Sequence, residues 1–448
     1  MIKNKAIHIT SLGCPKNLVD SEVILGFLYR SGCYPCDEPE QADILIVNTC
    51  GFIRSAVEEG VEEVLSCCRL KEEDPSKTIV VTGCLVQRYG LELLPELPEV
   101  DLFIGTEGFS RIAEYLDQAV RERAETDAKM VLLDPVSIME NSWPRHLSTP
   151  IHRAYLKIME GCSNKCTYCL IPSLRGRMRS RGVEDLVVEA GRLVDSGVRE
   201  ITLVGQDITS YAAGRGEGLT FLLRRILDST GVDWLRLLYL YPDKIGEELL
   251  ELMAADERLL PYFDIPLQHV SDPILKKMGR TTRDGAYELI DRIRSYLPEA
   301  GIRTTFMVGF PGETEHDLEF IARFMRECRL DNVGVFTFSN EEGCAAGKLP
   351  HHLSEEVKKS RYDYLMEIQA EISLQKNRAR VGQVLPVLVE GVSSETDLLL
   401  EARTSFQAPD IDGVVYINEG RCNAGDIIDV AITEAHPYDL VGSLVDKG

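Results

Sequence analysis

Residues 160–169 read EGCSNKCTYC. Cys162, Cys166 and Cys169 form a CxxxCxxC array directly after the strand-like run AYLKIME at 154–160. A structural zinc site would need four protein ligands, and no fourth Cys or His lies nearby at zinc-finger spacing. Three thiolates on a cubane iron-sulfur cluster instead leave one iron open, and barrel enzymes place their chemistry at the C-terminal ends of strands. The array therefore predicts a barrel that carries a cluster.

Further strand-like runs follow this array, with helical sequence between them. They are EITLVGQD (200–207), WLRLLYLYP (234–242), YFDIPLQ (262–268), RTTFMVGF (303–310) and VGVFTFS (333–339). Six strands separated by helices predict a partial (β/α)6 barrel over residues 151–380. Charged helical sequence from Ser354 to about residue 380 closes this domain.

The N-terminal part alternates apolar runs with helical patterns in the same way. The runs include AIHITSL (6–12), DILIVNTC (43–50), TIVVTGC (78–84) and LFIGT (102–106). This alternation predicts an α/β domain over residues 1–140 with a doubly wound parallel sheet. A segment rich in Pro and Ser follows, and we assign residues 141–150 to a linker.

The C-terminal part, residues 381–448, has short runs with β-branched residues bounded by turn residues. Five such runs predict a small antiparallel β-barrel. This module has three basic residues against twelve acidic ones, and the whole chain has a formal net charge of -23. Such acidity argues against direct nucleic-acid binding, which relies on Lys and Arg, and favours a basic partner.

The chain has no apolar segment that resembles a signal peptide or a membrane span, so we expect a cytoplasmic protein with no membrane partner. It has thirteen cysteines. An odd number in a reducing compartment favours metal or redox chemistry over a disulfide framework. Cys33, Cys36, Cys67 and Cys68 are expected to be incidental, and Cys328, Cys344 and Cys422 to be packing residues.

Three further cysteines share one setting. Cys14, Cys50 and Cys84 each end an apolar run and lead toward a helix. The carboxyl ends of parallel strands meet at one edge of a sheet, so these thiols can converge there. Any one of them alone would be an unremarkable core residue. Together they predict a second ligand site.

The three-cysteine α/β domain, the CxxxCxxC barrel and the terminal β-barrel resemble, in this order, the radical S-adenosylmethionine (SAM) methylthiotransferases. The last module resembles a TRAM domain. The resemblance implies two 4Fe-4S clusters, one on Cys14, Cys50 and Cys84 and one on Cys162, Cys166 and Cys169. It also implies that SAM bound to the second cluster yields a radical that activates a substrate carbon, with no catalytic side chains assigned beyond the cluster ligands. An electron donor such as flavodoxin or ferredoxin would reduce the clusters.

The same resemblance implies SAM contacts at the barrel strand ends. They are Tyr168, just before the last cysteine of the array, Gln206, Gln268 and the turn that begins at Gly309. Asp207, His269 and Glu313 lie beside them, and His269 is expected to form hydrogen bonds and not to bind metal. The run RGRMRSR brings Arg175, Arg177, Arg179 and Arg181 together. It is either a solvated basic loop or a site for a carboxylate of SAM or of the substrate.

The segment GCPKNLVDSE at 13–22 separates two branches of this family. Members that modify tRNA adenosine usually carry a GCQMN-like motif there and a more basic TRAM module. This chain resembles the branch that methylthiolates the β-carbon of an aspartate in ribosomal protein uS12, and its acidic C-terminal module fits a basic ribosomal protein. Two alternatives remain open, namely a tRNA adenosine methylthiotransferase and a non-catalytic iron-sulfur protein.

Overall fold

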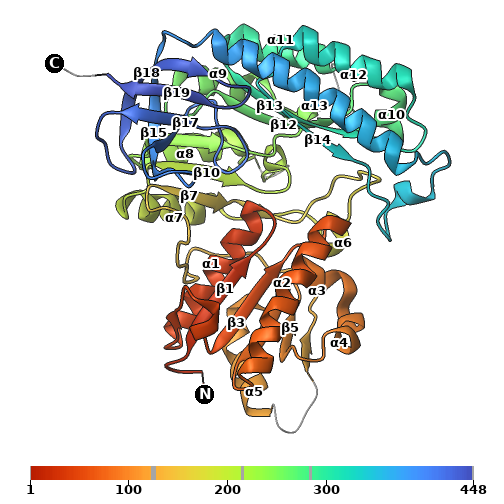
Figure 1. Ribbon diagram of the computed structural model, residues 1–448, viewed down its shortest axis with the longest axis vertical. Coiled ribbons are helices and arrows are strands. Elements are labelled where there is room, and N and C mark those ends of the chain that lie inside the picture. Colours follow the sequence, from red (N-terminus) through yellow and green to blue (C-terminus); the bar gives the residue numbers. More distant parts are fainter. Residues whose placement is uncertain (1, 123–127, 213–215, 282–284, 446–448) are drawn as a thin grey trace.

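The computed structural model describes residues 2–122, 128–212, 216–281 and 285–445 (Figure 1). The N-terminal region is a six-stranded sheet in the order β2-β1-β3-β4-β5-β6, and every strand pair in it is parallel. Its strands are β1 (Ala6–Ser11), β2 (Tyr34–Pro35), β3 (Ile44–Thr49), β4 (Thr78–Gly83), β5 (Leu102–Ile104) and β6 (Lys129–Val131).

Helices cover both faces of this sheet. They are α1 (Pro15–Arg30), α2 (Arg54–Glu73), α3 (Cys84–Tyr89), α4 (Leu93–Glu96) and α5 (Ile112–Glu122). In β3, Ile44 and Ile46 pack with α1 and α5, whereas Leu45 and Val47 pack with α2 and α3. Successive strand residues point to opposite faces, so near-continuous apolar strands are what a sheet buried on both sides requires. The doubly wound sheet predicted from the sequence is confirmed.

The central region is an open half-barrel of six parallel strands. Two three-stranded sheets, β11-β10-β7 and β12-β13-β14, are joined by a parallel bridge between Leu235 and Leu259. The strands are β7 (Arg153–Lys157), β10 (Glu200–Val204), β11 (Trp234–Leu237), β12 (Tyr262–Gln268), β13 (Gly301–Val308) and β14 (Asn332–Thr337). This arrangement confirms the predicted partial (β/α)6 barrel.

Six helices pack against the outside of the half-barrel in one continuous apolar core. They are α7 (Val183–Asp195), α8 (Leu219–Ser229), α9 (Glu247–Ala255), α11 (Ala286–Tyr296), α12 (Glu315–Cys328) and α13 (Glu355–Arg378). Short elements lie at the strand ends, namely β8 (Met159–Glu160), α6 (Ile171–Leu174), β9 (Arg179–Ser180) and α10 (Asp272–Lys277). The long closing helix α13 begins at the N-cap Ser354, as the sequence predicted.

The C-terminal region is a closed five-stranded barrel in the order β15-β16-β17-β19-β18. Its strands are β15 (Val384–Val392), β16 (Leu400–Thr404), β17 (Val415–Glu419), β18 (Ile427–Ala435) and β19 (Leu440–Leu444). Four of the five strand pairs are antiparallel, as expected, but β17 and β19 pair in parallel. The long connection through β18 brings β19 back beside β17 in the same direction and closes the barrel.

The C-terminal barrel docks on the N-terminal ends of the half-barrel strands, whereas the N-terminal sheet lies at their C-terminal ends (Figure 1). The docking contacts combine an apolar cluster that includes Leu388 and Ala408 with polar contacts between charged side chains. Arg403 bonds Glu200 at the start of β10 at 2.6 Å, Glu390 bonds His152 at 3.0 Å, and Asp410 pairs with Arg153 at 2.9 Å. Part of the acidity of the C-terminal module therefore serves to attach it to the half-barrel.

Within the described ranges, none of the helices combines the length and the apolar character that crossing a membrane requires.

Candidate cluster and substrate site

The three N-terminal cysteines lie at one edge of the sheet. Cys14 precedes α1, Cys50 follows β3, and Cys84 opens α3 directly after β4. Gly13 has a φ of 91°, and a Cβ on it would lie 2.8 Å from the Cβ of Cys50. Only glycine combines this backbone conformation with so close an approach. A Cβ on Gly51 would likewise lie 2.6 Å from the carbonyl oxygen of Cys84, so the three cysteine loops pack against one another.

Burial sets the protonation of these thiols. It raises the pKa of Cys50 to about 11, and the neighbouring Cys84 adds to this effect. Burial also raises the pKa of Cys84, although Arg175 acts in the opposite direction. In the free protein these two thiols are therefore protonated at neutral pH, and binding to a metal cluster must displace their protons.

The second set of cysteines lies on the loop that follows β7 and β8. The backbone N–H of Cys162 donates to Gly176 at 3.1 Å, and that of Cys169 donates to Cys166 at 3.2 Å. Thr167, between the cysteines, donates its N–H to Met278 at 2.9 Å, which fixes the loop against the end of α10. Burial raises the pKa of Cys169 to about 12, and Cys166 and Cys162 reinforce the shift.

The two cysteine sets border one junction between the N-terminal sheet and the half-barrel. Cys84 packs in a small apolar cluster with Leu170 and Leu174, which directly follow the second set. Cys344 belongs to the same cluster, and its thiol lies 3.1 Å from the carbonyl oxygen of Tyr168. Cys344 is a packing residue, as expected. Its position between the two sets is nevertheless a feature that sequence reasoning missed.

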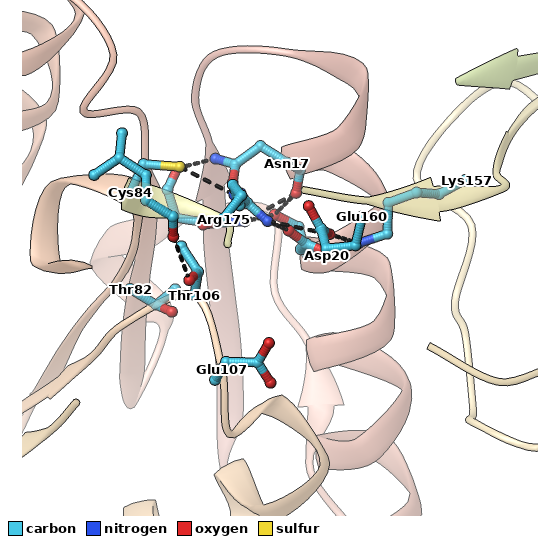
Figure 2. Close-up of polar contacts among 12 residues, drawn as sticks. Asn17, Asp20, Thr82, Cys84, Thr106, Glu107, Lys157, Glu160 and Arg175 are labelled. Atoms are coloured by element: carbon cyan, nitrogen blue, oxygen red, sulfur yellow. Dashed lines mark hydrogen bonds and ion pairs between the residues drawn. The ribbon is translucent and has the colours of Figure 1, made fainter. Parts of the chain in front are cut away.

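A buried charged network crosses this junction (Figure 2). Arg175 donates Nε to the Cys84 thiol at 3.2 Å, Nη1 to Asp20 at 2.6 Å and Nη2 to Asn17 at 2.9 Å. Lys157, at the end of β7, bonds both Asp20 and Glu160. Helix α1 is thereby tied to β7 and to the cysteine loop, which holds the two cysteine sets in a fixed relation.

The network also determines the charge of its carboxylates. Burial alone would raise the pKa of Glu160, but Lys157 and Arg175 outweigh it and hold that pKa well below its usual range. Glu160 is thus ionised at neutral pH although its side chain is only 10% exposed. A buried carboxylate that is paired with cations in this way keeps its negative charge.

The four predicted SAM contacts all lie at the C-terminal rim of the half-barrel. Tyr168 packs in an apolar cluster with Phe310, and its hydroxyl accepts a hydrogen bond from Arg280 at 3.4 Å. Gln206, just after β10, donates to Glu160 at 3.2 Å, and its Oε1 atom is buried with no partner among the described residues.

Gln268 and Gly309 have left-handed backbone conformations. Gln268 ends β12 with a φ of 72°, which is strained for a residue other than glycine and is typical of functional positions. Gly309 follows β13 with a φ of 74°, and a Cβ there would collide with the Lys358 side chain. A role of these residues in SAM binding stays a prediction.

The residues beside these positions on the rim form hydrogen bonds within the protein. Asp207 accepts hydrogen bonds from Asn164 at 2.8 Å and from Lys244 at 2.6 Å. The Nδ1 atom of His269 accepts from the backbone N–H groups of Val270 at 2.9 Å and Ser271 at 2.8 Å. The prediction that His269 forms hydrogen bonds is confirmed, and its burial lowers the pKa to about 4.

Two arginines of the run, Arg175 and Arg181, differ from both interpretations given above, whereas Arg177 is exposed. Arg175 and Arg181 are buried, so they are not part of a solvated loop. Arg175 binds Asp20, and Arg181 binds Asp185 at 2.6 Å, so the carboxylates that these arginines recognise belong to the protein itself. The sequence could not show this, because Asp20 lies more than 150 positions from Arg175.

Three family profiles match consecutive parts of the chain. The profile described as "Uncharacterized protein family UPF0004" matches residues 6–105, "Radical SAM superfamily" matches residues 156–325, and "TRAM domain" matches residues 381–445. The radical SAM match contains the CxxxCxxC array, and the first match contains all three N-terminal cysteines.

Relatives of similar length are found in several bacteria. A protein of Desulfotalea psychrophila named ribosomal protein uS12 methylthiotransferase RimO is 51% identical over 98% of this chain and 99% of its own length. A protein of the same name from Syntrophotalea carbinolica is 45% identical over 100% of this chain and 98% of its own.

The fold is similar to that of a solved structure. The radical SAM methyltransferase TsrM of Kitasatospora setae aligns with a TM-score of 0.53 at 15% identity, covering 74% of this chain and 73% of that one. At such low identity the likeness supports the architecture alone.

Proposed function

The chain belongs to the ribosomal protein uS12 methylthiotransferase family, and we propose that it methylthiolates the β-carbon of an aspartate in uS12 with the help of two 4Fe-4S clusters. It is a radical SAM enzyme and uses SAM with a 4Fe-4S cluster. The observation that supports the proposal is that both cysteine sets border the same junction. Two separate sets of three cysteines, from the sheet edge and from the half-barrel loop, border it, and Arg175 links them.

The donor sets fit iron-sulfur clusters. All six candidate ligands are thiols, which is the ligand type that these clusters take. Within the described ranges, no three His, Cys, Asp or Glu side chains are close enough to hold one metal ion. A cluster differs from a single ion because each thiolate binds a different iron atom. Cys162, Cys166 and Cys169 would hold the SAM-binding cluster, and Cys14, Cys50 and Cys84 the second one.

When bound, the clusters and SAM supply the reducing electron, the radical and the sulfur chemistry. The residues of the chain hold and shield that chemistry. Asp20, Lys157 and Arg175 fix the N-terminal sheet on the half-barrel, and all three are buried. Because their charges are paired within the network, they give the junction a buried polar lining. We place Tyr168, Gln206, Gln268 and the turn at Gly309 around SAM, since they share the rim that the cluster loop borders.

Partners follow from this chemistry. The substrate is uS12, free or within the small ribosomal subunit, and a flavodoxin-like or ferredoxin-like donor supplies electrons in the cytoplasm. Glu390, Asp410 and Asp412 of the C-terminal module are engaged with the half-barrel. Asp397, Glu419 and Glu434 of that module are exposed and can meet a basic protein, and its sparse basic residues make nucleic acid a poor ligand.

The test compares two substrates. Anaerobically reconstituted full-length protein, dithionite and SAM are incubated with a uS12 loop peptide or with tRNA, and products are followed by mass spectrometry. We expect methylthiolated peptide and 5'-deoxyadenosine. A product on tRNA alone would assign the chain to nucleoside modification, and no 5'-deoxyadenosine would make it a non-catalytic iron-sulfur protein.

A further inference from the structure

Lys16 is a buried cation at the junction. It lies in the first turn of α1, two residues after Cys14, and is only 7% exposed. Its Nζ atom lies 3.7 Å above the ring of Tyr239 and 3.4 Å from the carbonyl oxygen of Gly205. Tyr239 and Gly205 follow β11 and β10, so the ammonium group reaches the rim of the half-barrel. An ammonium has three N–H donors, and a long hydrogen bond to Gly205 together with the contact to the ring and hydroxyl of Tyr239 leaves one donor unused.

Lys16 differs from three other cations around this junction, whereas Arg280 at the rim bonds Cys166, Tyr168 and Pro266. Lys157 pairs with Asp20 and Glu160, Arg175 with Asp20, and Lys244 with Asp207. No carboxylate of the described residues forms an ion pair with Lys16. A buried charge without a counter-charge is costly, and proteins retain one where a ligand completes it.

A count of the charged side chains at the junction also points to Lys16. Lys16, Lys157 and Arg175 supply three positive charges, and Asp20 and Glu160 supply two negative ones. Both carboxylates are already shared between Lys157 and Arg175. Within this set one positive charge is in excess, and Lys16 is the cation without an ion pair, although Glu160 and the Cys14 thiol lie close enough to favour its charged form. A ligand with a single carboxylate would balance it.

We propose that Lys16 binds the side-chain carboxylate of the target aspartate, an inference that rests on the proposed function. The β-carbon of aspartate is bonded directly to that carboxyl carbon. A cation that holds the carboxylate therefore fixes the β-carbon two bonds from the oxygen that it contacts, beside the Cys14 loop and the half-barrel rim. Adenosine has no carboxylate, so the same contact selects a protein substrate over a nucleobase.

Binding of two peptides to the full-length reconstituted protein tests this role. A fluorescein-labelled uS12 loop peptide and its variant with Asn in place of the target Asp are titrated anaerobically and followed by anisotropy. The unmodified protein should prefer the Asp peptide by about 30-fold or more, the range expected for removing one partner of a buried charge pair. Lys16→Met should bind both peptides equally, and Lys16→Arg should restore part of the preference.

Lys244→Met is the matched control. Lys244 also lies over a tyrosine, with its Nζ 4.8 Å from the Tyr241 ring, but it already has Asp207 as a partner. This variant should keep the preference for the Asp peptide. Iron content is measured in parallel and should be unchanged in Lys16→Met.

Each contrary result has a distinct meaning. If Lys16→Met retains the preference for Asp while the unmodified protein shows it, the inference is wrong and the proposed function stands. If Lys16→Met loses iron, Lys16 stabilises a cluster and the inference is again wrong. If the unmodified protein binds neither peptide, the proposed function and the inference both fail.

Discussion

Asp20→Asn tests whether the buried network holds the N-terminal sheet on the half-barrel. Asp20 bonds Lys157 through one carboxylate oxygen and Arg175, at 2.6 Å, through the other. All three side chains are at most 6% exposed. Asparagine keeps the size but removes the charge, so two charge-assisted hydrogen bonds weaken and two cations lose a shared counter-charge. Breaking a buried pair in this way costs about 3–5 kcal/mol.

The loss of stability should be confined to the junction. Lys157 keeps Glu160, and Arg175 keeps Asn17 and the Cys84 thiol, so we expect about 3 kcal/mol, the lower end of that range. Hydrogen exchange measures it directly, because backbone amides protected by docking exchange when the sheet undocks. A loss of about 3 kcal/mol lowers protection about 100-fold in the first turns of α1 and in α6.

Asp363→Asn serves as the control. Asp363 pairs with Lys359 at 2.7 Å on α13, where both side chains are more than half exposed, and such pairs contribute little. Exchange in α1 and α6 should be unchanged in this variant. If Asp20→Asn changes protection by less than about fivefold, a difference under about 1 kcal/mol, the network does not hold the junction.

Other predictions concern the cysteines and acid stability. Reconstituted protein should contain about eight irons, and Cys14→Ala or Cys162→Ala should leave about four; an unchanged count in Cys14→Ala would make the N-terminal cysteines packing residues. Cys344→Thr should keep the full iron content, because Cys344 packs beside the sets and is not proposed as a ligand. The folded state holds the pKa of His269 at about 4, below the usual 6.5, so it favours the neutral ring. Its contribution is present above pH 6.5 and falls by about 3 kcal/mol as the pH drops to 4. Thermal unfolding of His269→Gln across this range should therefore be less sensitive to acid, and an equal slope would refute the assignment.

Much of the candidate site could be predicted because its signals are local. Cys14, Cys50 and Cys84 each follow a buried strand, and parallel strands end at one edge of a sheet. The CxxxCxxC spacing likewise sets three thiols on one loop without any long-range information. The N-terminal strands could be predicted for the same reason, since runs such as ILIVNT at Ile44–Thr49 are apolar on both faces.

Other features could not be predicted in this way. The arginine run was open to two interpretations, because nothing near Arg175 in sequence identifies Asp20 as its partner. The parallel pairing of β17 and β19 depends on how the small barrel closes. The acidity of the C-terminal module has a structural part as well, since Glu390 and Asp410 both pair with Arg153 at the base of the half-barrel.

Local sequence was enough to predict the cysteine positions, the alternation of strands and helices, and the order of the three modules, because each depends on residues close together in the chain. The tertiary structure alone decided how the modules meet. It placed Lys16 over Tyr239 and left it without a carboxylate among the described residues, although the sequence shows only a lysine after a proline. Ion pairs between distant residues depend on docked surfaces, and burial determines which charges must be balanced.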